Sequence, residues 1–175
     1  ARPMQGAADA SRIGYAGAEP FLLHATVEEN LRYGCPGASR AAIERAAAIA
    51  DADRFIAALP DGYATIVGGR GLALSDGQRQ RLGIARLVLA APRILVLDEA
   101  FSALDLDTEL RIRHGLWAAF PDRAALVISH RPVGLAECDR ILFLKDGRLA
   151  PITAGDLPSF EVASSAHTPP TGGSR

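Results

Sequence analysis

The sequence predicts an α/β fold in which a core of parallel strands carries an all-helical insertion. Residues 94–97 and 125–128 are short, continuously apolar runs, the form expected of central parallel strands that are buried on both faces. Helix-forming segments at 75–90 and 106–120 precede these runs, which gives the alternation of helix and strand that is typical of an α/β core. Residues 26–60 are predicted to be helical throughout, so we expect them to be an insertion in that core.

The first part of the chain is predicted to begin with a short strand at 12–15. The tetrapeptide TVEE at 26–29 has the T-x-x-E form of a capping box and predicts a helix start. An alanine-rich stretch at 39–59 is helical by propensity, and Asp51 and Asp53 indicate a break within it. We therefore expect two helices between 39 and 59.

The second half of the chain completes the alternation. The predicted helix at 75–90 presents a broad apolar face and stops before Pro92. Apolar residues at 141–144 and 148–150 flank an Asp-Gly turn, which predicts a closing hairpin.

Length and composition favour one compact domain with disordered ends. A chain of 175 residues with 49% hydrophobic content can bury one core but not two full-sized ones. Both ends are small and polar, and the C-terminal one is rich in Ser, Thr, Pro and Gly. We expect a disordered or truncated edge at 1–11, a folded domain at 12–150 and a largely disordered tail at 151–175. Within the domain, we expect a helical subdomain at about 22–90 and an α/β core at about 12–21 and 91–150.

The charge balance argues against a nucleic-acid partner. The chain has 19 basic and 20 acidic residues, a formal net charge of -1, which gives no electrostatic footprint for DNA or RNA. Cys35 and Cys138 fit no C-x-x-C pattern, which indicates a reducing compartment. No apolar run reaches the roughly 18 residues of a membrane-spanning helix, and no signal peptide is recognisable. The first residue is not methionine, so we expect a piece of a longer protein.

Three side chains at the ends of the predicted strands could carry chemistry. Asp98 and Glu99 directly follow the run at 94–97, and open α/β sheets bind ligands at the carboxyl ends of their strands. Such a pair suits phosphoryl transfer, because the Asp can hold Mg²⁺ and the Glu can orient or deprotonate water. His130 follows the next apolar run, so it emerges at the same edge if the two strands are neighbours. A solvated turn and a structural histidine are the alternatives.

A second candidate is the helix start at Ser75. Ser75 and Gln78 have the spacing of a capping box, which alone would explain them as structural. The same amides could bind a phosphate, with Gly77 permitting close approach. The only lysine, Lys145, lies outside any G-x-x-x-x-G-K-[ST] segment, so the sequence contains no P-loop. From rises of about 1.5 Å per helical residue and about 3.3 Å per strand residue, we expect Ser75 to lie too far from Asp98 to share one γ-phosphate.

Four motifs, in their order and spacing, resemble those of ATP-binding cassette (ABC) ATPases. They are LSDGQRQR, ILVLDEA, FSALD and ISHR, which resemble the signature, Walker B, D-loop and H-loop. Two further segments, IGYAGAEPFLLHATVEENL and YATIVGGRG, resemble the Q-loop region and the loop before the signature in ABC exporters. The resemblance covers about residues 12–150 and implies a P-loop NTPase-like fold with an all-helical signature subdomain. It also implies that the N-terminal third of the cassette, with Walker A and the adenine-stacking aromatic, is absent from this sequence.

The resemblance implies roles for the residues at the strand ends. Asp98 would support Mg²⁺, Glu99 would be the catalytic base, and His130 would contact the γ-phosphate. The implied cofactors are ATP and Mg²⁺.

The resemblance also implies a second cassette, because ABC ATPases form head-to-tail dimers that sandwich ATP. Ser75, Gly77 and Gln78 would approach ATP held by the opposite cassette, which is either identical or different. Asp105 would belong to the D-loop that crosses the dimer interface, and it could cap the following helix as well. The other implied partners are transmembrane domains, fused or separate.

Three positions depart from the family pattern. Ala18 stands where the Q-loop glutamine is expected, which removes a ligand or positioning group for Mg²⁺ and water. Asp76 replaces the first glycine of LSGGQ and should repel phosphate at short range. Gly69 stands where exporters usually carry an acid.

The hypothesis that follows is an ATP-binding and ATP-hydrolysing domain of an ABC exporter, held at the cytoplasmic face of the cell membrane by transmembrane domains. These residues alone should be inactive without a P-loop. Abundant arginine and alanine favour a bacterial source. The alternatives are a degenerate, non-catalytic regulatory cassette of an asymmetric pair and a soluble ABC ATPase of DNA repair or translation.

Overall fold

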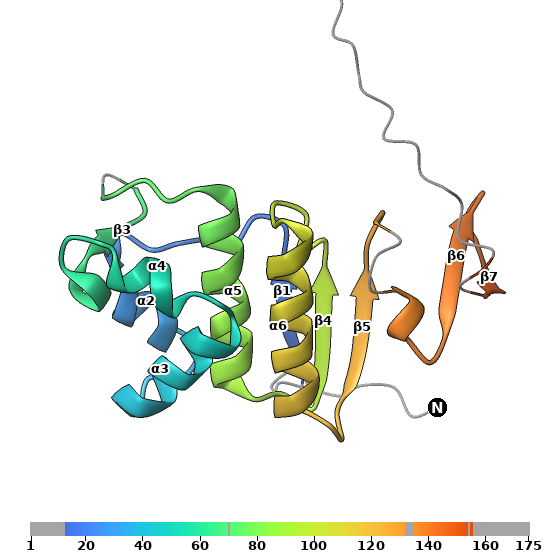
Figure 1. The fold of residues 1–175 in the computed structure, drawn as a ribbon, viewed down its shortest axis with the longest axis horizontal. Helices are drawn as coiled ribbons and strands as arrows, with labels where there is room; N and C mark the ends of the chain where they lie inside the picture. The colour runs from blue at the N-terminus through green and yellow to red at the C-terminus, as the bar shows by residue number, and fades with distance from the viewer. Residues whose placement is uncertain (1–12, 70, 132–134, 154, 156–175) are drawn as a thin grey trace, which may run out of the picture. The chain divides into compact units, whose positions relative to one another are not determined.

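A computed structural model describes residues 13–69, 71–131, 135–153 and 155 (Figure 1). The chain divides into two compact units, one ending at Ser129 and the other beginning at His130. Each unit is described by itself below. The predictions of disorder at 1–11 and beyond residue 155 lie outside the described residues.

The first unit contains a three-stranded parallel sheet. Its strands are β1 (Ile13–Gly17), β4 (Ile94–Asp98) and β5 (Ala124–Ile128), in the order β1-β4-β5. Both pairings are parallel and in register over five residues. The two apolar runs are therefore parallel strands, as predicted. The structure shows that they are also neighbours, so their carboxyl ends meet at one edge.

The sheet is buried on one face only. The helices α5 (Asp76–Ala90) and α6 (Leu106–Ala119) lie on the viewer's side of the sheet in Figure 1. Leu95 and Leu97 of β4 are fully buried, whereas Leu126 of β5 is 53% exposed. The prediction that the second run is buried on both faces was therefore wrong for the described residues. Side chains alternate along a strand, and among the described residues no element of this unit packs over the second face.

A helical segment precedes α5, with the predicted break in it. Its elements are β2 (Ala25–Thr26), α2 (Val27–Arg32), α3 (Arg40–Ile49), α4 (Asp53–Ala57), the 3₁₀ turn η1 (Gly62–Ala64) and β3 (Ile66–Val67). Asp51 separates α3 from α4 and adopts a left-handed conformation with φ of 52°. The capping box at Thr26 and Glu29 is present. The sequence did not predict the short antiparallel pair of β2 with β3.

The core of this unit joins the helical segment to the sheet through α5. Leu82 and Ile84 of α5 are fully buried, as is Ile43 of α3. Burying each such side chain contributes about 1.5–3 kcal/mol. The helix α5 therefore has a fixed position between the helical segment and β1, which it also contacts. The limits of the helical subdomain at about 22 and 90 remain a prediction.

The second unit contains the predicted hairpin. The 3₁₀ turn η2 (Leu135–Glu137) precedes β6 (Ile141–Lys145), which pairs antiparallel with β7 (Arg148–Ile152). Asp146 and Gly147 both have positive φ, 49° and 73°, as the Asp-Gly turn predicts. Strand β7 continues to Ile152, slightly beyond the predicted end of the folded domain. Among the described residues, no helix combines the length and the apolar character needed to cross a bilayer.

Candidate functional site

Asp98 and Glu99 lie where β4 ends, at the carboxyl edge of the sheet. Asp98 is level with Gly17 of β1 and Ile128 of β5. Glu99 leaves the sheet in a left-handed conformation with φ of 52°, and its N–H donates to the carbonyl of Ile128 at 2.9 Å. Such a conformation costs a non-glycine residue about 1–3 kcal/mol and persists only where its surroundings enforce it. The strand pairing therefore fixes the backbone of both carboxylates.

Tyr15 is a neighbour of Asp98 that the sequence reasoning missed. Its hydroxyl donates to Oδ2 of Asp98 at 3.2 Å. Loss of hydration raises the pKa of Tyr15, and the charge of Asp98 and this hydrogen bond raise it further. Tyr15 pairs with Val96, two residues before Asp98, so alternation places both side chains on one face. Only the register of β1 and β4 identifies Tyr15 as a neighbour of Asp98, and no pattern in the sequence indicates that register.

Ser75 and Gln78 form the predicted capping box at the start of α5. The N–H of Gln78 donates to Oγ of Ser75 at 3.2 Å, and the N–H of Ser75 donates to Oε1 of Gln78 at 2.9 Å. The structural interpretation of these residues is therefore correct. Their contact with phosphate remains a prediction.

Gly77 lets the start of α5 approach the FSALD segment, here called the D-loop (residues 101–105). A Cβ at Gly77 would lie 2.9 Å from the carbonyl oxygen of Ala103 and 3.2 Å from Cδ2 of Leu104. Both distances are shorter than an ordinary contact, so no larger side chain fits without a shift. The structure thus gives Gly77 a packing role beside its predicted role near a ligand.

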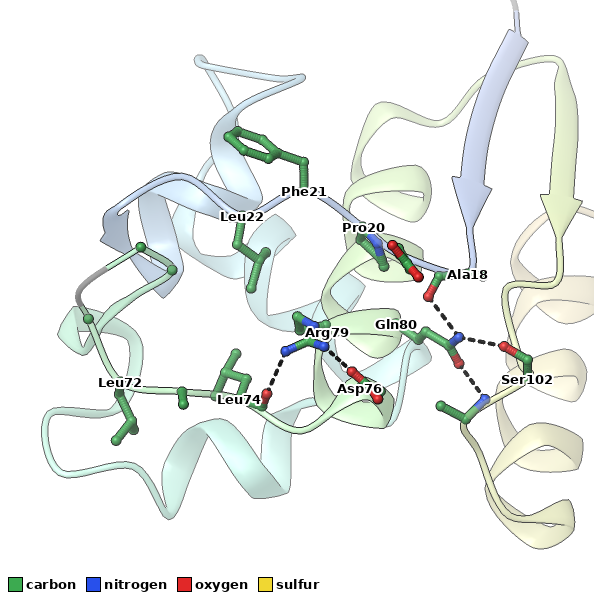
Figure 2. Close-up of a pocket in the computed structure, with 16 residues that line it drawn as sticks. Ala18, Pro20, Phe21, Leu22, Leu72, Leu74, Asp76, Arg79, Gln80 and Ser102 are labelled. Atoms are coloured by element: carbon green, nitrogen blue, oxygen red, sulfur yellow. Dashed lines mark hydrogen bonds and ion pairs between the residues drawn. The ribbon is translucent and has the colours of Figure 1, made fainter. Parts of the chain in front are cut away.

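Asp76, the unusual residue of the signature, is paired with a cation. Its carboxylate accepts from the guanidinium of Arg79, which also donates to the carbonyl of Leu74 at 2.9 Å (Figure 2). The Asp76 side chain is 70% exposed. The expected repulsion of phosphate by Asp76 is therefore reduced by a neighbouring positive charge.

Asp105 caps α6, as one of its two predicted roles requires. Its carboxylate accepts from the N–H of Thr108 at 2.9 Å and from the Thr108 hydroxyl at 2.8 Å. These hydrogen bonds lower the pKa of Asp105. A role at a dimer interface remains a prediction.

Ala18 is connected to the signature helix through its main chain. Its carbonyl accepts from Nε2 of Gln80 at 2.9 Å, and the same Nε2 donates to Oγ of Ser102 at 2.9 Å (Figure 2). The sequence reasoning missed Gln80. A glutamine among the apolar positions of α5 was the signal, because a buried amide needs partners.

Asn30 and Arg86 hold the segment that follows Ala18. The guanidinium of Arg86 donates to the carbonyl of Asn30 at 2.7 Å, to Oδ1 of Asn30 at 2.6 Å and to the carbonyl of Phe21 at 2.5 Å. Desolvation lowers the pKa of Arg86. Asn30 is fully buried and also bonds both backbone groups of Leu23. The segment is therefore fixed against α2 and α5.

Two cavities flank that segment. One, of about 570 Å³, lies between residues 18–22, residues 68, 69 and 71–74, and the start of α5 (Figure 2). The other, of about 540 Å³, is lined by Tyr15, Arg86, Asp98 and Glu99 among others.

Gly69 lies in the loop of the first cavity and has a left-handed conformation with φ of 49°. An acidic side chain at this position would be strained in that conformation. The departure of Gly69 from the exporter pattern thus agrees with the local backbone.

His130 is the first residue of the second unit. Its distance from Glu99 therefore stays a prediction.

The carboxylate of Asp98 at the sheet edge is a type of ligand that Mg²⁺ commonly has in proteins. Among the described residues, no group of three or more His, Cys, Asp and Glu side chains could hold a metal ion. Mg²⁺ is commonly held by one or two carboxylates together with phosphate oxygens and water. Asp98 at the end of β4 fits such a partial site.

Comparison with known proteins agrees with these motifs. A family model described as "ABC transporter" matches residues 3–102. The chain is 46% identical over 138 residues to the "Mitochondrial potassium channel ATP-binding subunit" of Xenopus tropicalis, covering 79% of this chain and 20% of that protein. It is 45% identical over 139 residues to the "ABC transporter ATM1" of Toxoplasma gondii, covering 79% of this chain and 12% of that protein.

A solved structure has the same fold. It is described as "Structure of a bacterial Atm1-family ABC exporter with ATP bound", with a TM-score of 0.79 and 42% identity, covering 85% of this chain and 26% of that one. The chain spans between 10% and 24% of the length of the curated relatives that it matches. The chain therefore belongs to the ABC transporter family, and its fold is that of the ATP-binding domain of Atm1-type exporters.

Proposed function

We propose that the protein containing this chain hydrolyses ATP with Mg²⁺ and uses that reaction to export a substrate across a membrane. Asp98 would hold Mg²⁺ together with phosphate oxygens, and Glu99 would accept a proton from the attacking water. His130 would contact the γ-phosphate of the same ATP. A bound Mg²⁺ would neutralise charge that develops on the phosphates.

The start of α5 would serve a different ATP, the one bound to a second cassette. Ser75, Gly77 and Gln78 would contact its phosphates, because the positive end of a helix and free amides attract anions. Asp105 in the D-loop would lie at the interface of the two cassettes. The second cassette would supply the reciprocal contacts, and either an identical or a different cassette satisfies this arrangement.

The observation that carries the proposal is the position of Asp98 and Glu99. Asp98 ends the central strand β4 in register with both of its neighbours, and the N–H of the next residue, Glu99, donates to the carbonyl of Ile128. In a sheet of this kind the carboxyl edge is where ligands bind. The identity of 42–45% to proteins named as ABC transporters, over most of the chain, supports the same chemistry.

Transmembrane domains would contact the cassette beside Ala18. Phe21 is 74% exposed and lines both cavities, next to a segment that Asn30 and Arg86 hold rigidly. An exposed aromatic on a fixed loop suits a protein contact. We place the cassette on the cytoplasmic side of the cell membrane, although two relatives are named as mitochondrial.

ATP turnover of the assembled transporter, compared with a Glu99→Gln variant, tests the proposal. We expect turnover to fall about 10²–10⁴-fold while ATP binding is retained, because the amide cannot accept the proton. The 175 residues alone should show no turnover, because they contain no P-loop. Turnover that is equal in both proteins would reject Glu99 as the base.

A regulatory cassette of an asymmetric pair is the second candidate. Ala18 favours it, because the side-chain amide expected at that position is absent. It predicts that the wild-type site hydrolyses no ATP while the partner cassette does. A soluble ABC ATPase would instead be active with no membrane domain.

A further inference from the structure

Gln80 occupies a buried position between three segments of the candidate site. It lies on α5 two residues after Gln78 and is 2% exposed. The three segments are the end of β1 at Ala18, the turn at Glu99 and the D-loop (Figure 2). Gln80 belongs to the signature-like segment LSDGQRQR, but the sequence alone assigned it no role.

Each polar atom of the Gln80 amide has a defined partner. Nε2 donates to the Ala18 carbonyl and to Oγ of Ser102, both at 2.9 Å, and lies 3.5 Å from the Glu99 carbonyl. Oε1 accepts from the N–H of Ala103 at 3.0 Å. A backbone N–H can only donate, so this bond fixes which end of the amide faces Ala103.

The buried amide makes the position specific for glutamine. A group without a donor leaves the Ala18 carbonyl and the Ser102 hydroxyl without this partner, and a group without an acceptor does the same to the Ala103 amide. Three of the four contacts are to main-chain atoms. Movement of α5 relative to the D-loop therefore changes all of them together.

We propose that Gln80 is a positioning residue that couples the start of α5 to Glu99 and the D-loop. The inference rests on the proposed function, in which the start of α5 contacts the ATP of the opposite cassette. A helix is rigid over half a turn, so a displacement of Ser75–Gln78 by that ATP is transmitted to Gln80. Gln80 then shifts the D-loop and the carbonyl of Glu99, whose side chain serves the ATP of its own cassette.

The hydrogen bond from Gln80 to Ala18 extends this coupling to the segment that follows β1. The Ala18 side chain cannot reach a ligand as a glutamine would, but its carbonyl is held by Gln80 at 2.9 Å. The segment beside the proposed membrane-domain contact is thus joined to α5. Gln80 links the two sites and this contact without touching the nucleotide.

Two variants of Gln80 in the assembled transporter test the proposal. Gln80→Met keeps the length but removes donor and acceptor, and Gln80→Glu keeps the shape but replaces the donor. We expect kcat for ATP to fall about tenfold or more in both, because small misplacements of reacting groups cost this much. KM for ATP should stay within about twofold, and the Hill coefficient for ATP should fall towards one, because coupling between sites is lost.

Ile84→Val is the matched control. Ile84 is fully buried on the same helix, and the change creates a small cavity without removing a polar contact. It should leave kcat, KM and the Hill coefficient within about twofold at a temperature where all variants are folded. The double variant Gln80→Met with Ser102→Ala should lose less kcat than the product of the two single losses, because both substitutions remove the same hydrogen bond.

Three results would count against the proposal or its premise. A Gln80→Met protein with the kcat and Hill coefficient of Ile84→Val would show that Gln80 only packs. Effects of Gln80→Met and Ser102→Ala that multiply would remove Ser102 from the coupling. A wild-type transporter that hydrolyses no ATP would instead overturn the proposed function, together with the inference that rests on it.

Discussion

Two helix starts meet at the D-loop, and they are capped by different groups. The start of α5 is capped by the neutral hydroxyl of Ser75, which accepts one bond from the N–H of Gln78 at 3.2 Å. The start of α6 is capped by the carboxylate of Asp105, which accepts from both the N–H and the hydroxyl of Thr108. Both ends carry the positive pole of a helix, but only that of α6 already has a full negative charge on its cap. Because the cap of α5 is neutral and its first-turn Asp76 is paired with Arg79, α5 suits a phosphate better than α6 does.

Exchanging the kind of cap at α5 is the strongest way to break this comparison. Ser75→Asp should preserve the helix, because Ser and Asp cap about equally well. It should raise KM for ATP or lower turnover by about tenfold or more, because a carboxylate repels the phosphates at short range. ATP turnover and thermal stability of the assembled transporter measure the two effects separately.

Ser39→Asp is the control for this exchange. Ser39 caps α3 with the same bond length, 3.2 Å to the N–H of Ala42, on a helix that takes no part in the proposed site. It should change neither turnover nor KM. Equal effects of the two exchanges on turnover would contradict a phosphate role for Ser75.

Gly77→Ala should have the next largest effect, because it separates α5 from the D-loop. The new Cβ would lie 2.9 Å from the Ala103 carbonyl, so one of the two segments must move. We expect a loss of about 1–3 kcal/mol of stability from overpacking and about a tenfold loss of turnover. Gly34→Ala, where a Cβ meets no atom within 4 Å, should be silent in both measurements. A Gly77→Ala protein with wild-type turnover would show that the close approach is dispensable.

The local elements of this site could be predicted from the sequence, whereas its contacts could not. Apolar runs and Asp98-Glu99 gave β4 and its edge, and the spacing of Ser75 and Gln78 gave the cap. Periodicity could not indicate that β5 is exposed, because the pattern records hydrophobicity and not what covers it. The exposure of Leu126 in the structure shows that one face of β5 is not covered.

Contacts between segments distant in sequence were the part that patterns could not supply. Gln80 reaches Ala18 across 62 positions, and Tyr15 reaches Asp98 across 83. Such pairs depend on strand register and on the packing of α5, which single-segment patterns do not encode. The pairing of Asp76 with Arg79 could have been predicted from the sequence, because residues three apart on a helix are neighbours.

The ion pair of Asp76 with Arg79 provides a test of smaller expected effect on the comparison of the two helix starts. Arg79→Ala removes the cation beside Asp76 and should raise KM for ATP about two- to fivefold, the range expected for an exposed ion pair. High salt should reduce the difference, because it screens exposed charges. Adding Asp76→Asn to Arg79→Ala should restore KM, because no unpaired carboxylate then remains. If KM stays raised in the double variant, Arg79 acts through its bond to the Leu74 carbonyl instead.

The smallest expected effect is a difference between the two caps in how their contribution to stability depends on pH. The pKa of Asp105 is lowered from its ordinary value of 3.8, first by the Thr108 N–H and then by the Thr108 hydroxyl. A carboxyl with a lowered folded pKa contributes stability above its unfolded pKa and loses it as pH falls through the folded value. Thermal unfolding at successive pH values should therefore show the wild type approaching Asp105→Asn in stability below about pH 4. Ser75 does not titrate in this range, so the difference between wild type and Ser75→Ala should stay constant there. If the Asp105→Asn difference were equally constant with pH, the carboxylate charge would not be what stabilises the start of α6.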